Sequence, residues 1–345
     1  MTLPVFSAPA AESVDVVSNV PEVSANTPVP TMIKPKLIES FIVEPGSTVN
    51  LKDFSTDWTE TDAARELGKD VTKERASEIL AESHKRLDAA QERLYASDTH
   101  SVLLIFQAMD AAGKDGTIRH VMSGVNPQGC QVYSFKKPST EELDHNFLWR
   151  YMKALPERGR IGIFNRSYYE DVLVVKVHPE WLGPGQPSNP DDKFWEKRYE
   201  DINNFEKHLT RNGTLILKFF LHLSKGEQKR RFLDRLKNPD KHWKFSEADM
   251  AEREHWKDYQ QAFEEAISAT STKRAPWYVI PADRKYVAHA LVADIVITAI
   301  QELNLKYPKV SADKLVKLET ARALLEKTSD TELSDRSVTL PTHQG

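Results

Sequence analysis

The stretch from Leu103 to Thr117, LLIFQAMDAAGKDGT, contains residue types that could bind phosphate. Gly113 lets backbone amides approach an anion, and Lys114 supplies a compact positive charge where a helix is expected to begin. The usual phosphate-binding loop reads Gly, four residues, Gly-Lys and then Ser or Thr. Here Ala108 takes the place of the first glycine, and the hydroxyl residue is absent. The predicted phosphate-binding positions are Ala111, Ala112, Gly113, Lys114, Asp115 and Gly116.

Asp110 puts a carboxylate in the middle of this loop. At about 5 Å from a phosphate charge, a carboxylate is repelled by roughly 1 kcal/mol in water and by about 3 kcal/mol in a protein cleft. Two arrangements would remove this cost: Mg²⁺ between the two groups, or a role for Asp110 in orienting or deprotonating an acceptor. We therefore predict that Asp110 binds metal and takes part in catalysis. Asp115 is either a second metal ligand or a first-turn acid that favours the helix dipole.

A second polar cluster, IFNRSYYED, covers Ile163 to Asp171 and follows a predicted strand. Ligands of α/β proteins bind at such carboxyl strand ends. Asn165 stands where an acid usually holds the metal, and its carbonyl can coordinate Mg²⁺ with help from Glu170 or Asp171. Arg166 could clamp a phosphate with two hydrogen bonds, the alternative being a surface ion pair with Glu170.

The segment 225–244 is strongly basic, with eight Lys or Arg residues against three acids. Arg231 and Arg235 are four residues apart, which places them on one face of a helix. The simplest alternative is a solvated helix face. Because the segment follows a predicted strand of the same sheet, we expect a helical lid at about 225–250 that binds phosphate through Arg230, Arg231 and Arg235.

Five short apolar runs predict the strands that position these loops: 101–106, 130–135, 160–164, 214–223 and 277–281. The runs do not alternate with polar residues, so both faces of the sheet must be covered. Segments of helical character separate them, and residues 71–96 have the spacing of one long amphipathic helix. We therefore predict a three-layer α/β/α sandwich with a parallel sheet, forming a single domain over residues 36–327.

Composition limits the remaining possibilities. Residues 1–35 and 328–345 are expected to be disordered tails, and the first 33 residues contain no Lys or Arg, which disfavours an organelle or secretion signal. The single cysteine, Cys130, favours a reducing, cytoplasmic location. A net charge of −4 gives no general affinity for nucleic acid, and no apolar run is long enough to span a membrane.

Several motifs together resemble the polyphosphate kinase 2 family, over about residues 36–304: QAMDAAGKDGT, FNRSYYED, SKGEQKRRFLDRL, HWKFSEADM and APWYVIPADRK. The resemblance implies a P-loop kinase fold like that of thymidylate kinases. It also implies reversible phosphoryl transfer between inorganic polyphosphate and nucleotides, with Mg²⁺, or alternatively Mn²⁺, as the metal. The residues that match the family's catalytic positions are Asp110, Lys114, Arg166 and Arg231.

The resemblance also suggests an acceptor. Many members have Asp where Asn165 stands, and the Asn form is similar to the subgroup that accepts nucleoside mono- and diphosphates. AMP and ADP are therefore the expected acceptors, with GMP and GDP as further candidates. The expected nucleotide-binding residues are Lys136, Arg150 and Asn165. Family members are commonly oligomers, so a homo-oligomer is expected.

Two other functions remain open at this point. One is a nucleoside monophosphate kinase of the same fold that uses ATP as donor. The other is a phosphate-binding protein without catalytic activity. A role for the basic segment in binding nucleic acid is less favoured, because the whole chain is mildly acidic.

Overall fold

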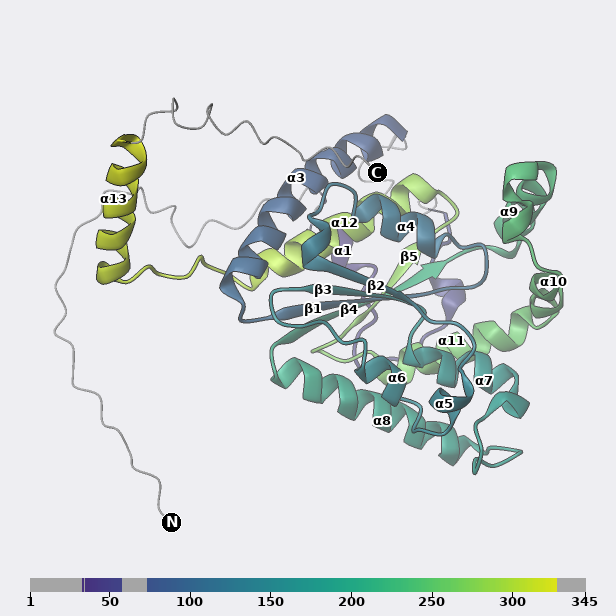
Figure 1. Ribbon diagram of the computed structural model, residues 1–345. Coiled ribbons are helices and arrows are strands. Elements are labelled where there is room, and N and C mark those ends of the chain that lie inside the picture. The colour runs from purple at the N-terminus through teal and green to yellow at the C-terminus, as the bar shows by residue number, and fades with distance from the viewer. Residues whose placement is uncertain (1–32, 34, 58–72, 328–345) are drawn as a thin grey trace, which may run out of the picture. The chain divides into compact units, whose positions relative to one another are not determined.

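The computed structural model describes residue 33 and residues 35–57 and 73–327. Its centre is a five-stranded sheet in the order β2-β3-β1-β4-β5, and every strand is parallel to its neighbours (Figure 1). The strands are β1 (Ser101–Gln107), β2 (Cys130–Ser134), β3 (Ile161–Asn165), β4 (Thr214–His222) and β5 (Trp277–Pro281). All five predicted strands are therefore confirmed, with small differences at their ends.

Helices cover both faces of the sheet (Figure 1). One face carries α3 (Lys73–Ser97), α4 (Lys114–Val121) and α12 (Lys285–Glu302), and the other carries α8 (Asp192–Arg211) and α11 (Trp256–Thr270). The shorter helices are α1 (Pro35–Glu39), η1 (Leu51–Asp53), η3 (Pro127–Gly129), α5 (Thr140–Leu143), α6 (Trp149–Met152), η4 (Tyr168–Val172), α7 (Val174–Val177) and η5 (Pro179–Trp181). This arrangement confirms the predicted α/β/α sandwich. The helix predicted for 71–96 is α3, and residues 71 and 72 lie outside the described residues.

The core is divided by the sheet into two large apolar clusters. Every residue of β1 is buried, and its side chains alternate between the two clusters. Leu104 packs with residues of α3 and α12, whereas Ile105 packs with residues of α8 and α11. Because both faces of β1 are covered, its residues 102–106 are all apolar, which explains the continuous apolar run.

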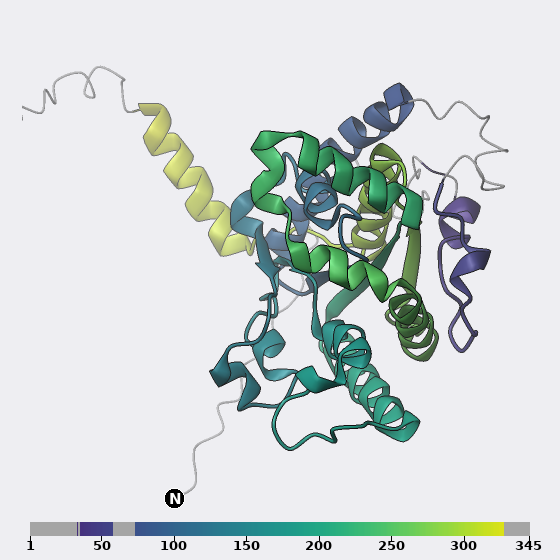
Figure 2. The same ribbon diagram turned by 90° about the vertical axis from the view of Figure 1, so that its right-hand side faces the viewer.

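The predicted lid is helical. It consists of α9 (Lys225–Lys237), the 3₁₀ segment η6 (Pro239–Lys244) and α10 (Glu247–Glu254). Ser224, the residue before α9, caps this helix by accepting a hydrogen bond from the backbone amide of Glu227. Figure 2, in which these helices are green, shows them in front of the sheet. Because α9 begins two residues after β4 ends, the segment lies at the carboxyl edge of the sheet.

Burial changes near both ends of the described chain, and the predicted domain limits stay a prediction. Most of the two predicted tails lies outside the described residues, but Ile33 is buried and its backbone amide donates to Asp294. At the other end, residues 306–327 are exposed throughout, including α13 (Ala312–Lys327). The predicted domain end at residue 327 therefore lies beyond the last buried residue. No helix in the described part of the chain is long and apolar enough to cross a membrane.

Candidate active site

The sheet order brings the two predicted loops together. β1 and β3 are neighbours, with Phe106 opposite Asn165, so the segments that follow them start side by side. The backbone amide of Arg166 donates to the carbonyl of Phe106 at 3.1 Å. The phosphate-binding loop and the NRSYYED segment therefore meet at the carboxyl edge of the sheet, where ligands of α/β proteins bind.

The loop between β1 and α4 has the backbone of an anion site. Gly113 precedes α4 with a φ of 105°, which a residue with a side chain rarely adopts. Ala111 also has a positive φ, 62°, and for an alanine this costs about 1 kcal/mol or more. Such strain is typical of functional loops. The loop thus presents the first amides of α4 toward the carboxyl edge of the sheet.

Lys114 lies at the start of α4 and is buried, with only 9% of its surface exposed. Its ammonium group donates to the carbonyl of Ala108 at 2.9 Å, on the other side of the loop. Burial, followed by the positive charge of Arg166, lowers the pKa of Lys114 to about 8. The carboxylates of Asp110 and Glu170 act in the opposite direction. The residue is therefore charged at neutral pH but loses its proton more readily than an ordinary lysine.

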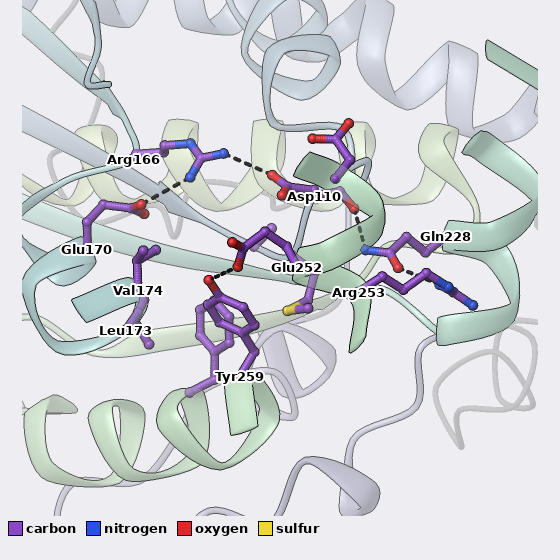
Figure 3. A pocket seen from close by; sticks show the side chains of 13 residues that line it. Asp110, Arg166, Glu170, Leu173, Val174, Gln228, Glu252, Arg253 and Tyr259 are labelled. Carbon is purple, nitrogen blue, oxygen red and sulfur yellow. Dashed lines mark hydrogen bonds and ion pairs between the residues drawn. The ribbon is translucent and has the colours of Figure 1, made fainter. Parts of the chain in front are cut away.

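Arg166 joins the two predicted loops (Figure 3). Its guanidinium group donates to Asp110 Oδ1 at 2.9 Å and to Glu170 Oε2 at 3.0 Å. Glu170, with a further contribution from Asp110, raises the pKa of Arg166 above its ordinary value. The sequence offered an ion pair between Arg166 and Glu170 as one interpretation, and this ion pair is present. Arg166 pairs with Asp110 at the same time. Within the described residues, Arg166 is the side chain that neutralises the unexpected carboxylate of the loop.

Asn165 connects the second loop to the first turn of α4. Its amide nitrogen donates to Asp115 Oδ1 at 2.6 Å and to Ser134 Oγ at 3.4 Å. Asp115 is an exposed first-turn acid, as one of the two interpretations proposed. The hydrogen bond occupies the nitrogen of Asn165 and leaves its carbonyl oxygen as the atom suited to a metal.

The predicted metal ligands partly suit Mg²⁺. Mg²⁺ binds oxygen, keeps several waters, and takes one or two carboxylates together with substrate phosphates. Asp110 fits this requirement, since Arg166 occupies only one of its oxygens. Glu170 fits less well, because its side chain is more buried than that of Asp110. Among the described residues, no group of three or more His, Cys, Asp or Glu is arranged to hold a metal without substrate.

Arg231 lies in a different place from the one expected of a lid arginine that contacts phosphate. It is buried, and its guanidinium group donates to the carbonyls of Ala111 and Ala112 in the loop. It also donates to the carbonyls of Ala282 and Asp283 and to Glu227. All its donor groups are therefore used. In this conformation Arg231 supports the phosphate-binding loop through the carbonyls of Ala111 and Ala112, and its direct contact with phosphate stays a prediction.

The other two predicted lid arginines lie on or near the surface. Arg230 is exposed and forms ion pairs with Glu227 and Asp234 on its own helix. Arg235 is only partly exposed, and its nearest acid is Asp249 of α10, with a nitrogen–oxygen separation of 3.7 Å. Exposed ion pairs of this kind are weak and exchange readily for a phosphate. Both residues remain available to an anion. Their ion-pair partners among the described residues are Glu227, Asp234 and Asp249, and not the residues of the Asp110–Arg166 pair.

The predicted nucleotide-binding residues lie beyond β2. Lys136 is exposed. Arg150 is more enclosed: it donates to the carbonyl of Lys136 at 2.8 Å, and its guanidinium group lies over the ring of Phe135. It also lies 3.7 Å from Glu142. Arg150 therefore has protein partners in this conformation, and its contact with an acceptor phosphate stays a prediction.

A pocket next to the site contains residues that the sequence did not single out (Figure 3). Gln228 donates to the backbone carbonyl of Asp110 and accepts a hydrogen bond from Arg253. Glu252 accepts a hydrogen bond from Tyr259. The sequence did contain a signal for this surface. Asp249 is three residues before Glu252 and four before Arg253, and residues at these spacings share one face of a helix. The lining from the lid and α11 consists of Gln228, Asp249, Glu252, Arg253, Tyr259 and Phe263.

A buried polar network supports the segment that carries Arg166 and Glu170. Lys218, in the middle of β4, has no exposed surface and lies 2.7 Å from Glu206 of α8. The other carboxylate oxygen of Glu206 accepts hydrogen bonds from the hydroxyl groups of Tyr168 and Tyr169 in η4. Lys218 also donates to Tyr169. A lysine within an apolar run was a visible signal that its charge must have a buried partner.

Comparisons with known proteins agree with this geometry. The family model described as Polyphosphate kinase 2 (PPK2) matches residues 70–308. An ADP-polyphosphate phosphotransferase of Rhodopseudomonas palustris is 53% identical over 259 residues, covering 74% of this chain and 90% of the relative. An AMP/ADP-polyphosphate phosphotransferase of Meiothermus ruber is 46% identical over 281 residues, covering 81% of this chain and 99% of the relative.

A solved structure shows the same similarity in three dimensions. The crystal structure of Polyphosphate Kinase 2 from Arthrobacter aurescens TC1 superposes with a TM-score of 0.75 at 39% sequence identity. The match covers 85% of this chain and 97% of that one. The family match spans both loops of the site, the lid and the supporting network. This chain belongs to the polyphosphate kinase 2 family.

Proposed function

We propose that this chain transfers phosphoryl groups reversibly between inorganic polyphosphate and nucleotides, with AMP and ADP as acceptors. The observation that carries the proposal is the ion-paired arrangement of Asp110, Arg166 and Glu170 beside Lys114. The names of the relatives from Rhodopseudomonas palustris and Meiothermus ruber support the reaction class. They differ in the acceptor named, so the choice of AMP and ADP rests on Asn165 and stays part of the proposal.

Phosphoryl transfer requires positioned groups and neutralised charge more than covalent chemistry by the protein. Lys114 provides a fixed positive charge within the loop that receives the donor phosphates. Arg166 can exchange its carboxylate partners for two phosphate oxygens, since both kinds of partner suit a guanidinium group. Asp110 then becomes free to hold a metal ion or to orient the acceptor phosphate. Arg231 acts indirectly, by fixing the carbonyls of Ala111 and Ala112.

The charge balance of the site supports a metal requirement. Asp110 and Glu170 carry two negative charges, and Lys114 and Arg166 carry two positive charges, so the four side chains are neutral before a substrate enters. Two phosphate chains add several negative charges that these residues do not balance. Mg²⁺, or Mn²⁺ in its place, held by Asp110 with the carbonyl of Asn165 nearby, would neutralise the transferring phosphoryl group.

The remaining parts of the proposal concern binding and setting. Arg230 and Arg235 are proposed to bind polyphosphate, and Lys136 and Arg150 to bind the acceptor, with guanine nucleotides as further candidates. The single cysteine favours a cytoplasmic setting. A homo-oligomer is proposed as well, and light scattering of the purified protein would measure it.

An assay without ATP tests the function. The protein is mixed with Mg²⁺ and polyphosphate, and AMP or ADP is supplied separately. We expect ADP from AMP and ATP from ADP. Lys114→Met should abolish both products, whereas Lys207→Met, which removes an exposed lysine of α8, should retain them. Product that forms only when ATP is the donor would show an ATP-dependent kinase, and no product from either acceptor would contradict the proposal.

A further inference from the structure

Four exposed basic side chains gather beside the phosphate-binding loop, on the side of α4 and α12. They are Arg119 of α4, Arg230 of α9, Lys241 of η6 and Lys285 at the start of α12. We refer to these four residues as the basic track. Arg119, Lys241 and Lys285 have no part in the site described above, and Arg230 was considered there only as a member of the lid.

The packing of α4 on α12 places both Arg119 and Lys285 near His289. His120 of α4 stacks on His289 of α12, with ring centroids 4.2 Å apart. Arg119 is next to His120 in the sequence. Lys285 lies one helical turn before His289 in α12. Burial, followed by the effects of His120, Lys285 and Arg119, lowers the pKa of His289 to about 4. His289 is therefore neutral at pH 7, and the positive charge at this contact belongs to the flanking side chains.

Arg231 connects Lys285 to the phosphate-binding loop. Its guanidinium group donates to Ala112 of the loop at 2.7 Å and to Ala282 at 2.6 Å, three residues before Lys285. Partial burial, and then the nearby charges of Arg231, Arg230 and Lys241, lower the pKa of Lys285. Glu227 opposes this effect. Lys285 of the basic track is therefore connected to the phosphate-binding loop through Ala282 and Arg231.

Within the described residues, three of the four side chains of the track have no ion-pair partner. Glu227 and Asp234 are the acids beside Arg230, and both are ion-paired with it. Arg119, Lys241 and Lys285 form no ion pair and no side-chain hydrogen bond with any other described residue, whereas Arg284, next to Lys285, pairs with Asp57. Unpaired like charges at short range repel one another, and a bound anion would remove that repulsion. The surface is thus suited to a chain of negative charges.

We propose that the basic track holds the part of the polyphosphate donor that extends beyond the phosphates on the loop. This inference rests on the proposed function and adds a binding surface to it. A polyphosphate carries about one charge per internal phosphate, so successive Lys and Arg contacts bind it much as they bind a nucleic-acid backbone. A short donor would end before the track, and only a longer donor would reach Arg119 and Lys285.

The test compares long-chain polyphosphate with tripolyphosphate in the double variant Arg119→Gln/Lys285→Gln. The ratio of kcat/KM for the long chain to kcat/KM for tripolyphosphate should fall about tenfold relative to the wild type, because two phosphate contacts are lost. The dependence of long-chain kcat/KM on salt should also become shallower, by about 0.7 in log–log slope for each contact. Arg119→Lys/Lys285→Arg should restore both values, since it restores the charges.

A matched control removes the same charge elsewhere. Arg211 and Arg274 are exposed and lie at the amino edge of the sheet, just before β4 and β5. Arg211→Gln/Arg274→Gln should leave the ratio unchanged. An unchanged ratio in the Arg119→Gln/Lys285→Gln variant, or an equal fall in the control, would overturn the inference. If the wild-type protein itself uses neither donor, the proposed function fails, and the inference fails with it.

Discussion

The protonation of Lys114 should set the alkaline limit of activity. Its pKa is about 8, and the loop requires the charged ammonium group to balance phosphate charge. At pH 9 about one tenth of the free protein keeps this proton, so kcat/KM should fall roughly tenfold for each pH unit above 8. The second pKa of a phosphate ester is near ~6, so the acceptor is fully ionised in this range. The fall would therefore report a group on the protein.

Lys114→Arg tests this assignment. A guanidinium group stays charged up to about pH 12, so the alkaline fall should disappear even though the larger side chain lowers the overall rate. The measurement is kcat/KM for polyphosphate with saturating AMP and Mg²⁺, between pH 7 and about pH 10, for both proteins. The reasoning is refuted if the arginine variant loses activity with the same apparent pKa as the wild type.

The same proton has the opposite effect on folding, which separates titration from alkaline unfolding. The pKa of Lys114 falls from its ordinary 10.5 to about 8 on folding, so the unfolded chain binds more protons between these pH values. The free energy of unfolding should therefore rise with pH across that window, by about 3 kcal/mol in full. Urea unfolding at pH 8 and at about pH 9.5 measures the change. If stability falls together with activity, the alkaline limit is unfolding and not loss of a proton.

Four further predictions follow from the contacts of the site. Arg166→Gln should lower kcat about 10³-fold and move the alkaline limit to higher pH, because Arg166 lowers the pKa of Lys114; an unmoved limit would contradict this. Asp110→Asn should lower kcat about 100-fold or more. It should also move the alkaline limit of activity to lower pH, because Asp110 raises the pKa of Lys114. A shift to higher pH, as expected for Arg166→Gln, would show that the two charges do not act on Lys114 in opposite directions. Lys218→Met should cost about 3–5 kcal/mol in urea unfolding, because it leaves Glu206 buried without its partner, and Lys218→Met/Glu206→Gln should recover part of the loss; equal losses would mean that packing dominates. Chelation of divalent metal should abolish transfer, with recovery on adding Mg²⁺ or Mn²⁺, and full activity in a chelator would contradict the metal requirement.

The elements of the fold were readable from local patterns. Strands β1, β3 and β5 are buried at every position because helices cover both faces of the sheet, and β1 at 101–107 differs from its prediction by one residue. The chemistry of the phosphate-binding loop was equally local. Gly113 and Lys114 stand where a strand-to-helix turn ends and the helix begins, and such a turn depends on neighbours in the sequence. These features required no knowledge of distant contacts.

The ion-pair partner of Asp110 could not be predicted from local sequence patterns. From the sequence, the cost of its charge had to be offset by a metal or by a role in acceptor placement, and Arg166 was expected either to clamp a phosphate or to pair with Glu170. The guanidinium group of Arg166 reaches Asp110, 56 residues away, because β3 lies next to β1 in the sheet. Strand order is a property of the whole fold, and no local pattern specifies it.

The burial of Arg231 also could not be predicted from local sequence. Arg230 and Arg231 are neighbours in the sequence and were both expected to bind phosphate, yet one is exposed and the other is buried under the loop. Which one turns inward depends on how α9 packs against the loop and against residues 282–283. The sequence by itself determined which residue types and elements this protein would use. The tertiary structure decided which charges face the substrates and which hold the loop in place, because burial and pairing depend on contacts between distant segments.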